Sequence, residues 1–522
     1  MKFKNIITYI ICLLFCFSFI LTKEIGSSKL FPTEFINNFH FSFMFFLKSI
    51  ILSLIVFVIT KLLIYVIKKV KFKKNNTLNN KIFILIFLLI FSSGLLFLLT
   101  YYPVENMGDT LYILYSPISI ATQHPLFYNL SIYIPYKIFL KLFSNVNLAL
   151  FLTSTIQLII MSSIITFILW WFNKTFKNKL LTIILSIYFV IVPIISNYNV
   201  ALIKDSIFAG ILLLYIPILY NVIITKGKWI DNKKNMILSS IVFILTSLIR
   251  NNGFYIIIFI LFILIINYRK YYKSWILLLI ISFISYKAPT LFVKDKPLFQ
   301  EKVGVPIQQI AYTAFVDGDI KNNKEYLDKW FINGDIKSHY SPYATDTIKW
   351  SSDFDSEYFN SNEKELFSTY FDLLPNNFES YVKSYLLITY GYWNLDEINY
   401  NQSRFLGLDD TDENAIKLFP ELHEKQLFPD IIQNFLTSFY ETFTTYLSGG
   451  ICLWILMFII IYLINTNRYK YIIILLPLIG NFLTLMLSGP LSMAFRYTVG
   501  YAYLLPIIIS IVLIKNNTKS NE

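Results

Sequence analysis

Long apolar runs, separated by short polar and basic segments, organise most of this sequence. Each run has roughly 15–23 residues with few or no charges, enough to cross a hydrocarbon core about 30 Å thick. A backbone in lipid must satisfy its own hydrogen bonds, so these runs are predicted to be helices. We predict twelve spans, at about 5–22, 44–66, 82–101, 147–170, 180–196, 206–224, 236–250, 253–267, 274–287, 447–465, 470–487 and 498–514.

One further apolar stretch, 126–143, is not counted as a span. It carries three tyrosines and two lysines among its apolar residues. Amphipathic aromatic side chains of this kind suit a helix that lies in the outer membrane interface. If this stretch crossed the membrane, every later loop would change sides.

The basic residues support this topology. They gather in segments 68–74, 174–179, 226–234, 269–273, 468–470 and 515–519. With twelve spans, all of these segments fall on the same side as the N-terminus, as the positive-inside rule requires. We therefore expect a multi-pass cell-membrane protein with both termini in the cytoplasm. An uncleaved first helix is favoured over a signal peptide, because no small-residue cleavage pattern follows it.

Composition and charge agree with a membrane protein rather than a nucleic-acid-binding one. The 522 residues are 56% hydrophobic, with mean hydropathy +0.58. The net charge of +13 is unevenly spread, since 288–445 holds 25 Asp and Glu against 13 Lys and Arg. The rest holds 7 acids and 32 bases, mostly in short loops. This pattern excludes a phosphate-binding face for nucleic acid. The abundance of Ile, Lys, Asn and Phe is typical of a low-GC, bacterial genome.

These patterns predict an all-α polytopic membrane protein with an acidic domain outside the membrane. We expect four parts: a two-helix membrane extension (1–75), a membrane core (76–287), an acidic extracytoplasmic domain (288–445) and a three-helix membrane segment with a cytoplasmic tail (446–522). The core contains an outward acidic loop (102–125) and the interfacial helix 126–143. The acidic domain is expected to be mixed or mainly helical. All three cysteines lie in apolar runs, so a disulfide framework is not expected.

Two acids, Glu105 and Asp109, lie close together just after the third span, on the predicted outer side. A carboxylate near the membrane can act as a general base, because partial burial raises its pKa towards working pH. The alternative is a solvated pair that simply ends a helix.

Further polar groups fall on the same predicted side: His124, Lys204 with Asp205, Arg250 with Asn251 and Asn252, and Arg496 with Tyr497. The planar fork of arginine matches phosphate geometry. Cations near an outward carboxylate therefore suit a lipid phosphate or pyrophosphate. Each group alone could instead be an interfacial anchor, and His124 before proline could be structural. Walker A, zinc-ligand and Gly-x-Ser-x-Gly patterns are missing, and repeated halves with broken helices are not evident.

The order of these features resembles the GT-C superfamily of polytopic glycosyltransferases. In that family the first core helix leads to an outward loop with an essential acid, and an interfacial helix follows, often opened by His-Pro. Here the 82–101 run, Asp109 with Glu105, and Gln123-His124-Pro125-Leu126 match this order. The resemblance implies a GT-C-like membrane core.

The chain is also similar to uncharacterised Gram-positive proteins of this type. Those carry a Lys-Asp pair, an Arg-Asn-Asn-Gly turn, a Pro-x-Gln-Gln-Ile-Ala stretch and a late Phe-Arg-Tyr. The matching positions are Lys204-Asp205, 250–253, 306–311 with Gln308 and Gln309, and Phe495-Arg496-Tyr497. The resemblance covers about residues 80–515, and its motifs are short.

The resemblance implies an inverting glycosyltransferase of the cell envelope with a polyprenyl-phosphate-linked sugar as donor. Asp109 would be the base, and Glu105 would position the acceptor or a divalent cation such as Mg²⁺ or Mn²⁺. The remaining site residues would bind substrate. No cofactor is certain and no metal-ligand set is predicted. The acceptor would be a glycan, a teichoic-acid-like polymer or a lipid, and membrane lipids are the other partners expected.

Two other hypotheses stay open. A transporter or flippase of a lipid-linked or anionic envelope precursor would use the same cations without making bonds. A non-enzymatic scaffold would recruit a partner through its acidic outer domain and would not need Asp109.

Overall fold

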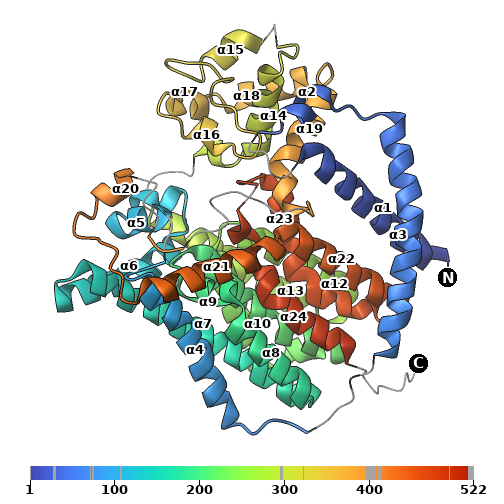
Figure 1. Cartoon of the computed structure of the whole chain (residues 1–522), viewed down its shortest axis with the longest axis vertical. Helices are drawn as coiled ribbons and strands as arrows, with labels where there is room; N and C mark the ends of the chain where they lie inside the picture. Colours follow the sequence, from blue (N-terminus) through green and yellow to red (C-terminus); the bar gives the residue numbers. More distant parts are fainter. Residues whose placement is uncertain are drawn as a thin grey trace.

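The chain folds into a bundle of long helices with a smaller helical unit above one end of it (Figure 1). The structure is a computed structural model that describes residues 2–26, 31–70, 72, 76–105, 108–293, 298–320, 323–395, 406–408, 413–492 and 494–514. Within these ranges, β-structure is limited to the isolated bridges Phe72–Ile514 and Phe331–Phe354. The predicted all-helical class is confirmed.

Apolar helices of membrane-spanning length build the bundle. Eight helical segments of the described chain are long and apolar enough to cross a membrane, or up to ten if each bent pair counts as one span. The chain is therefore a multi-pass membrane protein. Every predicted span overlaps a helix of the bundle, but α11 and α12 fall below that length, so the count of twelve stays a prediction. The bundle helices are α1 (Lys2–Ile25), α3 (Phe43–Lys69), α4 (Ile82–Thr100), α7 (Val146–Phe176), α8 (Lys179–Ile191), α9 (Pro193–Val200), α10 (Lys204–Ile224), α11 (Lys233–Ile249), α12 (Gly253–Asn267), α13 (Tyr272–Lys287), α22 (Gly449–Asn465), α23 (Leu476–Ser488) and α24 (Gly500–Leu513).

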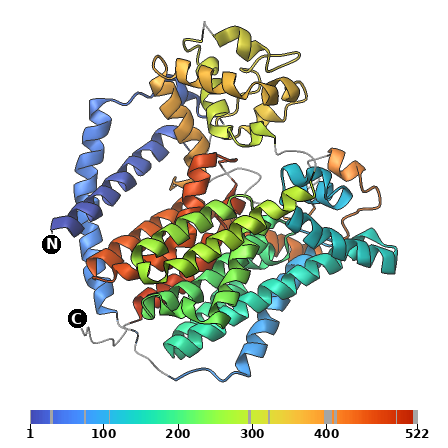
Figure 2. The same ribbon diagram turned by 180° about the vertical axis from the view of Figure 1, so that it is seen from behind.

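Helix α10 forms the centre of the bundle. Of the residues in its most apolar stretch of 18, 78% are buried. In α3 the corresponding share is 17%, and α3 lies at the edge of the bundle. Figure 2, seen from behind, shows the green helices α11–α13 covering the face opposite α21. Short 3₁₀ helices join or extend these elements: η2 (Lys228–Asp231), η3 (Arg269–Tyr271), η4 (Ala288–Leu291), η9 (Tyr469–Leu475) and η10 (Phe495–Thr498).

The fifth predicted span is a broken helix. α8 and α9 meet at a 62° bend, and Pro193 opens α9 because its missing N–H is not needed in a first turn. Ser154 Oγ of α7 donates to the carbonyl of Val200 (2.8 Å), and Gln157 donates to that of Ala201. These two carbonyls lie at the other end of α9, at its junction with α10, where lipid would leave them unpaired. The prediction of one continuous span over 180–196 is therefore corrected to two helices with a bend between them.

Three elements follow α4 at the end of the bundle that faces the upper unit: α5 (Gly108–Tyr115), η1 (Ser119–Thr122) and the longer α6 (Leu126–Phe143). The bounds of α6 equal those of the predicted interfacial helix. Ser144 then adopts a left-handed conformation, and the Asn145 side chain caps α7 by accepting the amide of Leu148 (2.9 Å). α6 and α7 therefore form a helical hairpin.

The upper unit contains α14 (Gly304–Phe315), α15 (Lys324–Asp328), α16 (Asp346–Lys349), α17 (Ser356–Ser361), α18 (Glu363–Leu373) and α19 (Phe378–Thr389), with η5 (Phe299–Glu301) and η7 (Tyr390–Tyr392). Its core is aromatic and includes the fully buried Trp330 and Phe359, whose rings lie 5.0 Å apart.

Two boundaries of this unit differ from the prediction. Helix α2 (Thr33–Asn38), expected in the membrane extension, packs into it, since Phe31 contacts Phe315 (5.4 Å between rings) and His40 Nδ1 lies 2.8 Å from Glu379 Oε1. Conversely, α20 (Glu413–Lys417) contacts α5, and α21 (Asp430–Tyr446) contacts α4 and α9. The compact unit therefore covers 298–395 of the predicted 288–445, plus α2 (Figure 1).

The ends of several spans meet far from the upper unit. Asn465 at the end of α22 donates to Thr8 of α1 (2.9 Å), and Lys61 of α3 donates to Asn465 (2.6 Å). The bridge between Phe72 and Ile514 joins the segments after α3 and α24. The described basic turns lie at this end of the spans; part of segment 68–74 and all of segment 515–519 fall outside the described residues.

Candidate functional site

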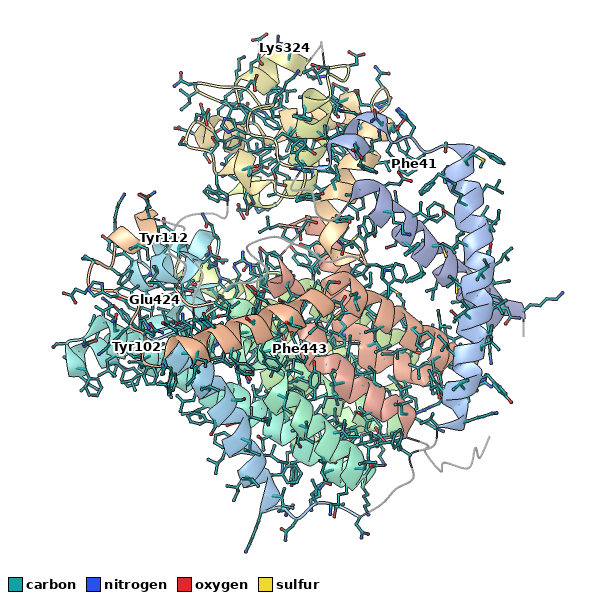
Figure 3. All side chains as sticks on the ribbon, in the orientation of Figure 1. Phe41, Tyr102, Tyr112, Lys324, Glu424 and Phe443 are labelled. Atoms are coloured by element: carbon teal, nitrogen blue, oxygen red, sulfur yellow. The ribbon has the colours of Figure 1, made fainter. Side chains whose placement is uncertain are left out.

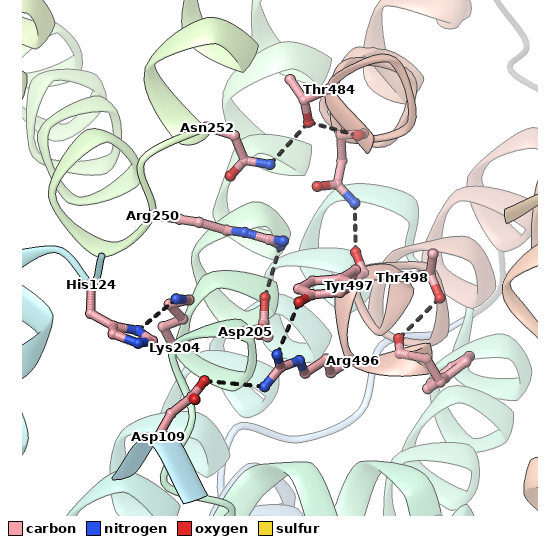
Figure 4. Close-up of polar contacts among 12 residues, drawn as sticks. Asp109, His124, Lys204, Asp205, Arg250, Asn252, Thr484, Arg496, Tyr497 and Thr498 are labelled. Carbon is pink, nitrogen blue, oxygen red and sulfur yellow. Dashed lines mark hydrogen bonds and ion pairs between the residues drawn. The ribbon is translucent and has the colours of Figure 1, made fainter. Parts of the chain in front are cut away.

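Polar residues from five separate segments converge at the end of the bundle that faces the upper unit (Figure 4). The segments are α5, the loop before α6, the first turn of α10, the turn between α11 and α12, and η10 before α24. Their members are Asp109, His124, Lys204, Asp205, Arg250 and Arg496 with Tyr497.

Two backbone-directed hydrogen bonds bring α5 to the start of α10. The amide of Leu202 donates to the carbonyl of Glu105 (3.0 Å), and Thr110 Oγ1 donates to the carbonyl of Leu202 (2.6 Å). Asp109 lies between the two tethered positions in the sequence. The tether therefore sets its carboxylate beside the residues that open α10.

Asp109 pairs with Arg496. Its Oδ2 lies 3.4 Å from Nη1 of Arg496, whose Nη2 donates to the hydroxyl of Tyr497 (2.9 Å). The Asp109 side chain is 44% exposed, whereas that of Arg496 is 15% exposed. The carboxylate is thus held by a cation but open to an incoming molecule.

His124 contacts the same group through Lys204. Nζ of Lys204 lies 2.7 Å from Nδ1 of His124. Burial and the neighbouring Lys204 lower the pKa of His124 to about 3. The negative charge of Asp109 acts in the other direction and raises this pKa, but by less. The imidazole is therefore neutral at neutral pH, accepts from Lys204 through Nδ1, and carries its hydrogen on Nε2.

The pKa of Asp109 differs from the prediction. Burial raises this pKa, as expected, but the charges of His124, Arg496 and Lys204 lower it by more than burial raises it. The resulting pKa lies well below its usual range. Nearby cations favour the ionised carboxylate more strongly than desolvation opposes it. Since His124 is itself neutral at neutral pH, Arg496 and Lys204 are the cations that stabilise the charge there. Asp109 is therefore ionised and able to accept a proton.

Asp205 and Arg250 form a second, hidden ion pair. Arg250 Nη1 lies 2.9 Å from Asp205 Oδ1, and the side chains are 9% and 1% exposed for Arg250 and Asp205 respectively. The Arg250 guanidinium carbon also lies 5.4 Å from the ring centre of Phe208 and 5.3 Å from that of Tyr497. This side chain is therefore fixed on three sides.

The predicted Arg-Asn-Asn-Gly turn holds Arg250 in place. Asn251 donates to the carbonyl of Gln123 (3.4 Å), and Asn252 donates to Thr484 of α23 (3.0 Å). A Cβ on Gly253 would lie 2.1 Å from the carbonyl oxygen of Thr246, so only glycine permits α11 and α12 to approach this closely. Both asparagines brace the turn rather than face Asp109.

With Lys204 protonated, the site carries one net positive charge. Lys204, Arg250 and Arg496 are cations, Asp109 and Asp205 are carboxylates, and His124 is neutral. Tyr497 adds an aromatic surface between the two guanidinium groups, since the Arg496 carbon lies 4.9 Å from its ring centre. The arrangement suits an anion with delocalised charge, such as a phosphate ester.

Glu105 is not part of this cluster. It is fully buried, and its Oε2 accepts the amide of Gly407 (2.6 Å), while Glu424 accepts the next amide, that of Leu408 (2.8 Å). Figure 3 places Glu424 and Tyr102 at the same edge of the bundle, where the amide of Lys425 donates to the Tyr102 carbonyl (3.1 Å). Burial raises the pKa of Glu105 well above its usual range. The hydrogen bond from Gly407 lowers this pKa in part, and the nearby charge of Glu424 raises it again.

Gln308 and Gln309 also lie elsewhere, in α14 of the upper unit. Gln308 donates to the carbonyl of Ser341, and Gln309 donates to that of Tyr381 (3.0 Å) while accepting from Tyr370 (2.9 Å). They connect helices inside that unit. A divalent-cation site at Glu105 and Asp109 gains no support either: among the described residues, no three His, Cys, Asp or Glu side chains form a group that could hold a metal.

The upper unit fixes the loop that carries Arg496. The Tyr392 hydroxyl donates to the carbonyls of Pro490 (3.1 Å) and Leu491 (3.0 Å). The amide of Ser492 donates to Tyr343 (2.9 Å), and its hydroxyl accepts the amide of Gly391 (2.8 Å). No sequence pattern points to Tyr392, because the residues it contacts lie about a hundred positions away. Phe208 could have been found, since it lies three residues after Asp205, the partner of Arg250, and so shares its face of α10.

The family model described as "Family of unknown function (DUF6020)" matches residues 115–522. The chain belongs to this family. In this DUF6020 chain the match includes His124, Lys204, Asp205, Arg250 and Arg496, whereas Asp109 and helices α1, α3 and α4 precede it. No curated protein and no solved structure matches the chain.

Proposed function

We propose that this protein is a membrane glycosyltransferase of the GT-C type that takes a sugar from a polyprenyl-phosphate donor. The observation that carries the proposal is a half-exposed carboxylate, Asp109, paired with Arg496 beside Lys204 and the buried Arg250–Asp205 pair. A base next to a group of phosphate-binding cations is what transfer from a lipid phosphate requires.

The chemistry follows from this placement. The acceptor hydroxyl gives its proton to Asp109 as its oxygen attacks C1 of the sugar. The bond between C1 and the phosphate oxygen breaks on the opposite face, so the anomeric centre inverts. The polyprenyl phosphate leaves with the bonding electron pair and stays against Lys204 and Arg496.

Charge matching supports this step. The donor is a phosphodiester with one negative charge, which balances the one net positive charge of the site. After transfer, the leaving phosphate monoester carries a second negative charge, while protonated Asp109 has lost its own. The site then carries two net positive charges. Its electrostatics therefore favour the products as charge develops on the leaving group.

Donor binding also tunes the base. In the free protein, Arg496 and Lys204 hold the pKa of Asp109 low. A phosphate bound to the same cations offsets part of their charge, so the pKa of Asp109 rises when the substrate is present. The carboxylate becomes a stronger base at the moment it is needed.

The membrane orientation is part of the proposal. Twelve spans with both termini in the cytoplasm would place the basic turns inside and the Asp109 site, with the upper unit, outside. The acceptor would be a glycan, a teichoic-acid-like polymer or a lipid of the cell envelope. The aromatic and acidic upper unit would contact it.

The test is transfer from labelled polyprenyl-phosphate sugars in isolated membranes. Asp109→Asn keeps the side-chain shape and removes the base, so we expect transfer to fall by about 100-fold or more. Asp231→Asn is the matched control, because Asp231 is an exposed acid in η2 outside the cluster. Equal transfer by wild type and Asp109→Asn would remove Asp109 from the mechanism.

A transporter is the second candidate, and the α8–α9 break favours it. Discontinuous helices near membrane depth are common in transporters. Here, however, Ser154 and Gln157 of α7 hold the far end of α9, at its junction with α10, through the carbonyls of Val200 and Ala201. Movement of the labelled lipid between leaflets without sugar transfer, in wild type and Asp109→Asn alike, would favour the transporter.

A further inference from the structure

A pocket of about 380 Å³ lies at the end of the bundle away from Asp109. It is enclosed by the first residues of α1 and the last turns of α3 and α22. Lys4, Lys61 and Lys68 line it together with Asn5 and Asn465. Figures 1 and 2 both show α1 and α3 side by side at the edge of the bundle.

The pocket is organised by hydrogen bonds rather than by ion pairs. Lys61 Nζ donates to Asn5 Oδ1 (2.7 Å) and Asn465 Oδ1 (2.6 Å), and Lys68 Nζ lies 3.3 Å from the carbonyl of Asn465. Lys61 and Lys68 are seven residues apart, which is about two helical turns, so they share one face of α3.

The lysine charges have no acidic partner in the pocket. Each described residue that lines it is a lysine, asparagine, isoleucine or tyrosine. Three ammonium groups gathered without a carboxylate repel one another, and a bound anion would relieve that repulsion. A phosphate group supplies both the charge and several hydrogen-bond acceptors.

The surroundings of the pocket are apolar. On α1, Phe3 is 71% exposed and Ile6 54% exposed; on α3, Leu62 is 60% exposed and Val66 57% exposed. In a spanning helix such side chains face acyl chains. The chemistry next to the pocket is therefore that of a lipid: an anionic headgroup against the lysines and hydrocarbon along the helices.

We propose that this pocket binds the phosphate of an anionic phospholipid whose acyl chains lie along the exposed faces of α1 and α3. The site is separate from the Asp109 cluster and independent of the proposed glycosyl transfer. It also joins α1 and α3, which precede the matched family region, to α22 within that region.

The test is lipid retention by the purified full-length chain in mild detergent, measured by native mass spectrometry. Phosphatidylglycerol is compared with phosphatidylcholine of the same acyl chains. We expect one tightly retained phosphatidylglycerol and weaker retention of phosphatidylcholine. A basic residue contributes about fivefold to such binding, so Lys4→Gln and Lys68→Gln should each weaken it by about that factor.

Lys2→Gln is the matched control. Lys2 is exposed, belongs to α1 and lies two residues from Lys4, but it does not line the pocket. An equal loss in Lys2→Gln would mean that only diffuse surface charge acts, and the proposal would fail. Because Lys68 is exposed, its replacement leaves the packed interior intact.

A further arm separates the two sources of phosphate. Wild type is titrated with inorganic phosphate alone, and its thermal midpoint is followed. A phosphate-induced rise that Lys68→Gln abolishes, with phosphatidylglycerol retained no better than phosphatidylcholine, would assign the pocket to free phosphate and overturn the lipid proposal. Preferential phosphatidylglycerol retention that Lys68→Gln weakens and Lys2→Gln does not would support it.

Discussion

Three carboxylates near the end of the bundle that faces the upper unit have three different environments. Asp109 is half exposed beside Arg496, Asp205 is buried against Arg250, and Glu105 is buried against a backbone amide. The sequence predicted that these acids share one side of the membrane, because that follows from span counting. It could not predict their partners. Lys204 and Asp205 are adjacent but bind different residues, since consecutive helical side chains point about 100° apart.

Arg496 is the residue whose geometry the site depends on most. Its guanidinium reaches Asp109 with one nitrogen and the Tyr497 hydroxyl with another. Lysine keeps the charge but cannot hold both partners, so Arg496→Lys should lower transfer by about 100-fold. The measurement is the membrane transfer assay at saturating donor.

Arg269→Lys serves as the control for that substitution. Arg269 is exposed in η3, among the basic turns. Retention of full activity by Arg496→Lys would show that position 496 contributes charge alone.

At the scale of elements, the sequence predicted the helices whose position depends on the length of an apolar run. It did not predict the bends and contacts that depend on packing. Apolar helices lie at the predicted spans, and the bounds of α6 agree with the prediction, because both depend on local composition. The α8–α9 break, the transfer of α2 to the upper unit and the return of α21 to the bundle depend on contacts with distant residues. Periodicity alone carries no information about such contacts.

The segment around Gly407 gives a pH test of one such contact. Burial raises the pKa of Glu105 above its ordinary 4.5. A raised folded-state pKa contributes stability that is complete below about pH 4.5 and is lost as the pH rises through the raised value. In Glu105→Gln that contribution to the pH dependence is absent. Relative to wild type, the variant should therefore gain stability as the pH rises.

Thermal unfolding of the full chain in detergent, from about pH 4.5 to 8, measures this difference. Glu363→Gln is the control, because Glu363 is an exposed acid in the first turn of α18. A difference between wild type and Glu105→Gln that stays constant over the whole range would contradict the assignment.

At the scale of the whole molecule, the basic turns lie at one end of the spans and the Asp109 cluster at the other. This separation was predictable, because the basic clusters between the apolar runs can be read directly from the sequence. The upper unit could be recognised from its sequence as acidic and outside the bundle. Its helices, and its hydrogen bonds to the loop that carries Arg496, could not be predicted.

Cysteine labelling in intact cells tests the orientation. The native Cys12, Cys16 and Cys452 are buried, so they give little background. Asn333→Cys in the upper unit should react with a membrane-impermeant thiol reagent, and Lys234→Cys at the start of α11 should react only after lysis. Both positions are exposed. Labelling of Lys234→Cys in intact cells would show that the orientation is the reverse of the proposed one.

The packing of α2 into the upper unit also sets an order of biosynthesis. Phe31, just before α2, packs against Phe315 and Tyr340, and His40, just after it, lies beside Glu379. These partners follow about 280 or more residues later in translation. At about 5–20 residues per second, the ribosome needs on the order of tens of seconds to make that stretch. Under the proposed topology, the segment would by then have crossed the membrane without these partners. Its apolar side chains would be exposed to chaperones outside the cytoplasm.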